Sequence, residues 1–443
     1  MFKKNDKKVI NAWAFYDWAN SVYNLVITTA IFPIYYLVAV KPEGQDPNAT
    51  NYVEFFGRLF VDTELYSYAI AGSSLVVVLL MPILSGIADY RGNKKAFLKF
   101  FCYLGSLSCI SLFWFKHLPL EIGMLSPFFA SIGFWGSLVF YNAYLPEIAT
   151  KENHDRVSAK GFAMGYIGSV LLLVAILVYS EGFGGDIEYG FIAVGLWWAG
   201  FSQYTYKHLP KSEATQTEER EKQHNVLTNG FLELRRVWRE LQNLPLLKTY
   251  LAAFFVFNMG VQTIMQVAVL FAREEINWPT DPVTGEKEKG GLIISIILIQ
   301  LVAIVGALVM SRLSKKYGNI TVLKIATIIW GAVCLAAYFI AEVHEFYILA
   351  AIVGFVMGGT QALSRSTYAK ILPRTLDHTS YFSFYDVLEK LGLVIGPLLF
   401  GIIIGLAGEM RPSILMLIVI FGIGLGLLFI VPIKKYREQI LVE

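Results

Sequence analysis

Long, uninterrupted apolar segments constrain this sequence more than any other feature. A helix needs about 20 apolar residues to cross the hydrocarbon core of a membrane. The segments are continuous rather than alternating, which disfavours a β-barrel and leaves α-helices as the spanning element. We therefore expect an all-α integral membrane protein with 12 transmembrane helices, near residues 10–40, 64–88, 97–115, 124–145, 159–180, 189–206, 248–271, 291–313, 320–341, 346–369, 381–406 and 412–433.

The composition agrees with a membrane protein and argues against other classes. The chain is 56% hydrophobic and 16% charged, whereas a soluble domain has about 25% charged residues. A soluble enzyme and a disordered chain are therefore disfavoured, and a net charge of +3 does not suggest nucleic acid. The first apolar segment is too long for a signal peptide and contains Asp17, so it is predicted to be the first span.

Motifs of catalysis and of metal binding are missing from the sequence. The 3 cysteines lie in apolar segments and have neither a disulfide pattern nor metal-ligand spacing. There is no nucleotide-binding glycine motif and no nucleophile elbow. We expect no catalytic residue, no metal and no cofactor, and hence no enzyme.

The basic residues predict the orientation. With the N-terminus placed inside, 29 of the 37 lysines and arginines fall in cytoplasmic segments and 7 fall outside. Basic residues favour the cytoplasmic side. We expect both termini in the cytoplasm, and a location in the cell (inner) membrane if the source is bacterial.

The longest predicted cytoplasmic segment divides the chain in two. Its first part is polar, and its second part has an apolar stripe at helical spacing, formed by Leu227, Phe231, Leu234, Trp238 and Leu241. This pattern predicts a helix on the cytoplasmic membrane surface, either as a strut between halves or as a partner-docking site. The predicted domains are an N-terminal six-helix bundle (1–206), a cytoplasmic linker with an amphipathic helix (207–247) and a C-terminal six-helix bundle (248–443).

The two halves share sequence features. The segments 85–93 and 311–319 both begin with Ser and end with Gly-Asn, and the fourth and tenth spans both end in Leu-Pro. Such repeats predict two bundles related by a pseudo-two-fold axis along the membrane normal, with a central site between halves that rock.

These features resemble the major facilitator superfamily. In the segment after the second span, Asp89, Gly92 and the pair Lys94 and Lys95 fit that superfamily's signature, although Ser85 and Tyr90 depart from it. Four more specific segments resemble the branch of autophagy-linked vacuolar amino-acid effluxers and their bacterial relatives: Trp13–Ser21, Tyr141–Glu147, Gly358–Ser366 and Phe384–Asp386. The resemblance covers most of the chain, from the first span to the eleventh.

The resemblance implies a small-solute transporter whose spans 1, 4, 7 and 10 line a central cavity. It also implies a conformational latch between spans 2 and 11, formed by Asp89, Arg91, Gly92 and Lys94. A plain cytoplasmic loop would explain the basic residues but not Asp89.

Polar residues recur along single faces of these same spans. They are costly in hydrocarbon and need a reason. Hydrogen bonds between helices are the alternative to an aqueous path. The predicted substrate-cavity residues are Asp17, Asn20, Asn24, Tyr141, Asn258, Gln262, Gln266, Gln361 and Arg365.

Charged residues inside the spans predict two ion pairs. Asp17 and Arg365 lie at similar depth and would pair, as a gate, a substrate clamp or a structural bridge. Asp386 and Lys390 are four residues apart, which favours an intrahelical pair. Glu389 would then be unmatched and, with Asp17, a proton-coupling candidate, unless it meets Arg365 or a surface lysine.

We therefore predict a secondary active transporter that moves a small polar metabolite, with amino acids as one class, by alternating access. The alternatives are a non-transporting receptor or scaffold and a lipid translocator with the same fold. The expected partners are a small-molecule solute, the lipid bilayer and, if transport is coupled, protons. We expect no nucleic-acid partner and a monomer.

Overall fold

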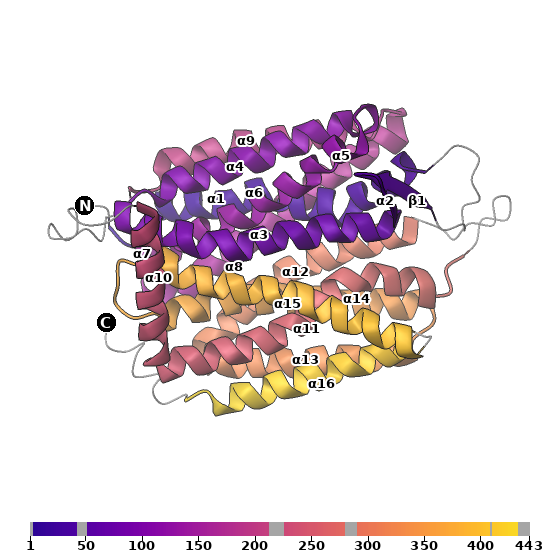
Figure 1. The fold of residues 1–443 in the computed structure, drawn as a ribbon. Helices are drawn as coiled ribbons and strands as arrows, with labels where there is room; N and C mark the ends of the chain where they lie inside the picture. The colour runs from indigo at the N-terminus through magenta and orange to yellow at the C-terminus, as the bar shows by residue number, and fades with distance from the viewer. Residues whose placement is uncertain (1–2, 42–50, 212–225, 280–289, 408–409, 433–443) are drawn as a thin grey trace.

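Helices that run side by side form most of the chain, as the apolar segments predict (Figure 1). The structure is a computed structural model, and it describes residues 3–41, 51–211, 226–279, 290–407 and 410–432. Within these ranges, eleven helical segments are long and apolar enough to cross a membrane. The helix α9 (Tyr189–His208) is less apolar, but it packs lengthwise against α1 and α4. It corresponds to the sixth predicted span and brings the total to twelve.

The N-terminal group begins with a span that changes its helical form. The helix α1 (Lys7–Val22) continues as the π-helical segment η1 (Tyr23–Ile31) and then as α2 (Phe32–Ala39). The second span is α3 (Asp62–Arg91), and the third is α4 (Lys94–Ser111) with η2 (Leu112–His117). The fourth span consists of α5 (Leu120–Gly123), α6 (Leu125–Asn142) and α7 (Leu145–Ile148). The fifth consists of η3 (Lys151–Asn153), α8 (His154–Leu177) and η4 (Val178–Gly182).

The C-terminal group has six long helices. Glycines let two of them approach closely, because a Cβ at Gly306 would lie 1.9 Å from the carbonyl oxygen of Phe355. The helices of this group are α11 (Pro245–Glu275), α12 (Gly290–Tyr317), α13 (Asn319–Phe339), α14 (Val343–Ile371), α15 (His378–Ala407) and α16 (Arg411–Ile430).

A short hairpin departs from the all-α expectation. The strands β1 (Tyr52–Phe55) and β2 (Arg58–Val61) pair antiparallel, with Tyr52 opposite Val61. Phe56 and Gly57 form the turn, and both have positive φ angles, of 49° and 73°. The apolar pattern of the spans carries no information about so short an element.

The amphipathic helix of the linker is α10 (Val226–Gln242), and it crosses the ends of both helix groups (Figure 1). It packs against α3, α11 and α15, so its inner side meets protein rather than lipid. Trp238 is 51% exposed and packs on the ring of Phe384, while Leu241 is buried. The side chains of Leu227, Phe231 and Leu234 lie outside the described residues. We refer to this end of the molecule as the α10 end.

Candidate functional site

A buried ion pair joins the two helix groups at the residues predicted to pair. One guanidinium nitrogen of Arg365, Nη2, lies 3.2 Å from Oδ2 of Asp17. The hydroxyl of Tyr141 donates to the same oxygen over 2.7 Å. Both charged side chains are nearly inaccessible, with 4% and 6% of their surface exposed. A charge pair buried in this way depends on further hydrogen bonds, because desolvation is costly.

The N-terminal helices supply those further bonds. Nε of Arg365 donates to Oγ of Ser158 over 3.0 Å, and Nη2 donates to the Ser158 carbonyl over 2.9 Å. Nη1 donates to Oδ1 of Asn142 over 3.3 Å. The rings of Trp13 and Phe162 lie within 4.8 Å of the guanidinium carbon. We call Asp17, Tyr141, Asn142, Ser158 and Arg365 the central charged site; it ties α1, α6 and α8 to α14.

A glycine makes room for this arrangement. A Cβ built at Gly161 would lie 2.3 Å from Oδ2 of Asp17 and 3.0 Å from Nη2 of Arg365. Any side chain at this position must displace the carboxylate or the guanidinium. Gly161 therefore contributes to the site because it has no side chain.

The predicted pair of Asp386 and Lys390 was wrong. Nζ of Lys390 lies 2.9 Å from Oε2 of Glu389, and it sits 3.4 Å from the ring centre of Trp135 on α6. The aromatic face attracts the ammonium group and holds it away from the carboxylate one turn earlier. Glu389 also accepts a hydrogen bond from Nε2 of Gln262 over 3.3 Å, so the prediction that it is unmatched was wrong as well.

Asp386 is a buried carboxylate without a hydrogen bond among the described residues. It is 2% exposed, and neither of its oxygens has a hydrogen-bond partner among the described residues. Arg365, Lys390, Glu389 and the amide of Asn142 are near enough to influence it electrostatically. A buried carboxyl of this kind needs a proton, a water or a ligand.

The other predicted cavity residues lie in several separate contacts. Tyr166 donates to Oε1 of Gln361 over 2.5 Å, and Gln266 donates to the carbonyl of Leu393 over 2.9 Å. Asn24 lies in the π-helical segment, where its carbonyl accepts a bond from a threonine hydroxyl.

Two predicted cavity residues carry unused hydrogen-bonding groups. Asn20 and Asn258 are buried, and the side-chain nitrogen of each has no partner among the described residues. These two asparagines lie on α1 and α11, the first span of each predicted half. Their common role in a cavity stays a prediction.

The end of α3 meets the start of α15, where the latch is predicted. Oδ1 and Oδ2 of Asp89 accept bonds from the backbone nitrogens of Thr379 and Ser380, over 3.2 and 2.7 Å. Free N–H groups at a helix start favour a carboxylate. Gly92 ends α3 with a φ of 63°, which glycine tolerates.

The other two predicted latch residues have different surroundings. Lys94 forms an ion pair with Glu147, which also contacts His378 at the start of α15. Arg91 is exposed. The latch role of these residues stays a prediction.

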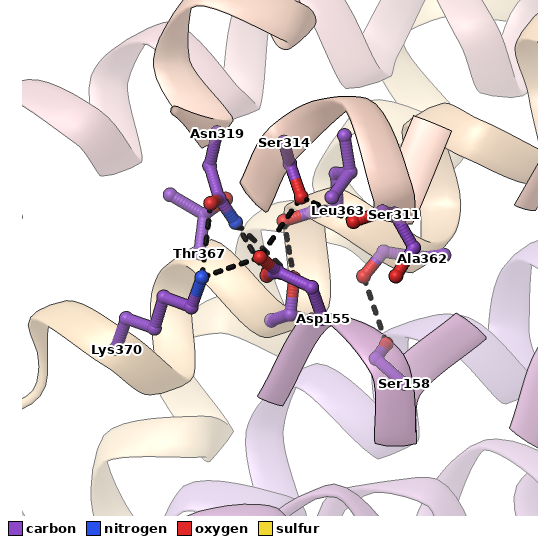
Figure 2. Close-up of polar contacts among 10 residues, drawn as sticks. Asp155, Ser158, Ser311, Ser314, Asn319, Ala362, Leu363, Thr367 and Lys370 are labelled. Atoms are coloured by element: carbon purple, nitrogen blue, oxygen red, sulfur yellow. Dashed lines mark hydrogen bonds and ion pairs between the residues drawn. The ribbon is translucent and has the colours of Figure 1, made fainter. Parts of the chain in front are cut away.

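A second polar network joins the two helix groups (Figure 2). It was not predicted from the sequence. Its centre is Asp155, buried in the first turn of α8. Its carboxylate accepts bonds from Lys370 (2.5 Å), Asn319 (2.6 Å), Ser366 (2.7 Å) and Ser314 (2.9 Å). We call these five residues the Asp155 network; it ties α8 to α12, α13 and α14 at the α10 end.

Comparisons with known proteins agree with this architecture. The family model described as "Vacuole effluxer Atg22 like" matches residues 5–441. The MFS-type transporter YxiO of Bacillus subtilis is 31% identical over 441 residues, which span 97% of this chain and 96% of that protein. Autophagy-related protein 22 of Kluyveromyces lactis is 25% identical over 423 residues, which span 87% and 83% of the two chains.

Solved structures show the same fold at low sequence identity. The human organic anion transporter MFSD10 has a TM-score of 0.71 at 13% identity, over 96% of this chain and all of that one. The fucose:proton symporter FucP of E. coli has a TM-score of 0.65 at 14% identity, over 98% and 97%. The chain has the major facilitator fold and belongs to the Atg22-like vacuole effluxer family.

Proposed function

We propose that this protein is a secondary active transporter that moves a small polar solute by alternating access, with its termini in the cytoplasm. The central charged site carries this proposal, because it links the two helix groups through one buried ion pair. Such a pair can hold one state of the transporter closed and separate in the other. A solute that replaces one partner would shift the balance between these states.

Unused polar groups favour a transporter over a scaffold. Asn20, Asn258 and Asp386 are buried and polar, and each has an atom without a partner in the described part of the chain. A scaffold gains nothing from such groups, since each costs free energy when dry. A transporter uses them when its interior fills with water or solute.

An amino acid is the first solute to test. The central charged site offers a guanidinium group for a carboxylate, and the nearby Asp386 offers a carboxylate for an ammonium group. The two charges of a free amino acid match that pair. The family of this chain is named for vacuolar effluxers, which agrees with a solute carrier.

If transport is coupled to protons, Asp386 replaces Glu389 as the first candidate for the proton carrier, with Asp17 next. Glu389 is held by Lys390 and Gln262, and Asp17 by Arg365 and Tyr141. Each of these two carboxylates therefore has a cationic partner. Asp386 has two oxygens without a partner among the described residues, and a proton removes the cost of a buried charge.

The test is uptake of labelled amino acids into proteoliposomes, with and without a pH gradient. Saturable uptake that Arg365→Gln reduces at least tenfold is expected, with Arg273→Gln as the control, because Arg273 is exposed. Fluorescent-lipid flipping in the same vesicles tests the lipid translocator. Flipping without amino-acid uptake would replace the proposal by that alternative, and neither activity would favour the scaffold.

A further inference from the structure

A groove of about 550 Å³ lies on the outer side of the N-terminal helices. It is open to the surroundings, since Phe201 and Tyr204 on its wall are 37% and 39% exposed. The lining residues come from three helices: Asn11 and Phe15 from α1, Lys160 and Met164 from α8, and Phe201 and Tyr204 from α9. In a membrane-spanning protein such a lateral groove faces lipid.

The groove contains the cation Lys160, which forms no ion pair with any described residue. Nζ of Lys160 donates a hydrogen bond to Oδ1 of Asn11. Arg156 lies one turn earlier on α8, is exposed, and is close enough to repel Lys160. In the part of the chain that the structure describes, neither residue forms an ion pair. Two neighbouring cations favour the binding of an anion.

An apolar stripe continues from the cation along one face of α8 and into the start of η4. Ile167, Leu171, Val174 and Val178 follow Met164 at helical spacing, and they are 39%, 52%, 39% and 52% exposed. The distance from Lys160 to Val178 is about 27 Å at 1.5 Å per residue. That is close to the thickness of the hydrocarbon core, about 30 Å. The cations therefore stand at one end of a membrane-deep apolar track.

We propose that this groove binds one anionic phospholipid, of the phosphatidylglycerol or cardiolipin type, from the leaflet at the α10 end. Lys160 and Arg156 hold the phosphate, and the amide of Asn11 meets the polar headgroup. An acyl chain lies along the stripe of α8. Basic pockets between spans favour such headgroups, and the amphipathic ring of Tyr204 suits the interface region.

The apolar track decides for a lipid over a free anion. A lipid contacts the cations with its phosphate and the exposed stripe with an acyl chain, whereas a soluble phosphate would contact the cations alone. The inference rests on the membrane topology and is independent of the transported solute.

The test is native mass spectrometry of the full chain in detergent, titrated with phosphatidylglycerol and with phosphatidylcholine of the same acyl chains. Each basic residue near an anionic headgroup is worth about a fivefold change in affinity, so the double variant R156Q/K160Q should bind phosphatidylglycerol about 25-fold more weakly. Binding of phosphatidylcholine should change less than threefold. The control is K315Q/K316Q, which removes two exposed cations of α12 at the same end.

A second variant keeps the charges and closes the space. Met164→Trp should fill the groove and weaken phosphatidylglycerol binding at least fivefold, and intact mass and thermal melting establish that each variant is folded. Equal losses in the control variant would mean non-specific charge attraction and would overturn the proposal. Inorganic phosphate competing as well as the lipid would also overturn it, because the site would then be a free-anion site. So would full retention of lipid binding in both groove variants.

Discussion

Asp155→Asn should weaken the contact between the two helix groups at the α10 end. The carboxylate accepts four bonds from the C-terminal helices, including one from the buried ammonium group of Lys370 (Figure 2). Removing one partner of a buried ion pair costs about 3–5 kcal/mol. Asparagine keeps the shape and part of the hydrogen bonding, so we take the lower value. A change of about 3 kcal/mol alters the equilibrium between closed and open forms about 150-fold.

The assay is alkylation of a single cysteine placed at Ala159. This residue is 1% exposed and packs against Ala307 and Ala362 of the C-terminal helices, so a cysteine there reacts only when the helix groups separate. The native cysteines, all buried, are first replaced by alanine, namely Cys102, Cys109 and Cys334.

The expected result is a rise in the alkylation rate of at least tenfold in Asp155→Asn. Lys370→Gln should behave similarly, because it removes the other charge of the same pair. The control is Glu188→Gln, whose ion pair with Lys116 lies within the N-terminal helices. If the folded Asp155→Asn protein reacts within twofold of the parent, the Asp155 network does not hold the helix groups together, and the reasoning is refuted.

Three further changes test the central region and the predicted latch. Asp386→Asn should abolish solute accumulation driven by a pH gradient while retaining exchange down the solute's own gradient, and preserved accumulation would make Asp386 structural. Gly161→Ala should lower uptake at least tenfold, because its methyl group takes the place of the Asp17 carboxylate; Gly331→Ala, with open space at its Cβ position, should leave uptake unchanged. Asp89→Ala should slow turnover with near-normal solute affinity, and a changed affinity at normal turnover would contradict the latch.

Hydrophobicity and depth in the membrane are local properties, and they allowed good predictions. The length of each apolar segment is enough to predict its helix, because a membrane leaves few other structures. The contact of Asp17 with Arg365 followed from their similar depth, since a lone charge at that level is costly.

Side-chain direction depends on distant neighbours, and here the predictions failed. The position of Lys390 is determined by the ring of Trp135 on α6, which lies more than 250 residues away in the sequence. The spacing of Asp386 and Lys390 within one helix carries no information about that ring. A helix-pair rule derived for water-exposed helices therefore fails inside a packed membrane protein.

The Asp155 network was missed for a related reason. Its acid lies in α8 and its partners lie in α12, α13 and α14, so the network exists only after the helix groups meet. In the sequence, Lys370 falls in a segment predicted to be cytoplasmic, where a basic residue needs no partner. One signal was present, however: the segment 85–93 contains an acid, and the related segment 311–319 contains none.

That asymmetry has a structural explanation. The end of α3 lies against the start of α15, and the end of α12 and the start of α13 lie against the start of α8. Asp89 provides the carboxylate from its segment and accepts backbone N–H groups at the start of α15. In the second half the roles are exchanged, because Asp155 provides the carboxylate from the start of α8 and the segment supplies the donors Ser314 and Asn319. Each contact thus contains one acid facing donors, and a second acid in the segment 311–319 would have placed two carboxylates together. The two contacts occupy equivalent places, but the acid comes from the segment 85–93 in one and from the start of α8 in the other. Removing the charge of either acid therefore weakens the contact between the two helix groups at the α10 end.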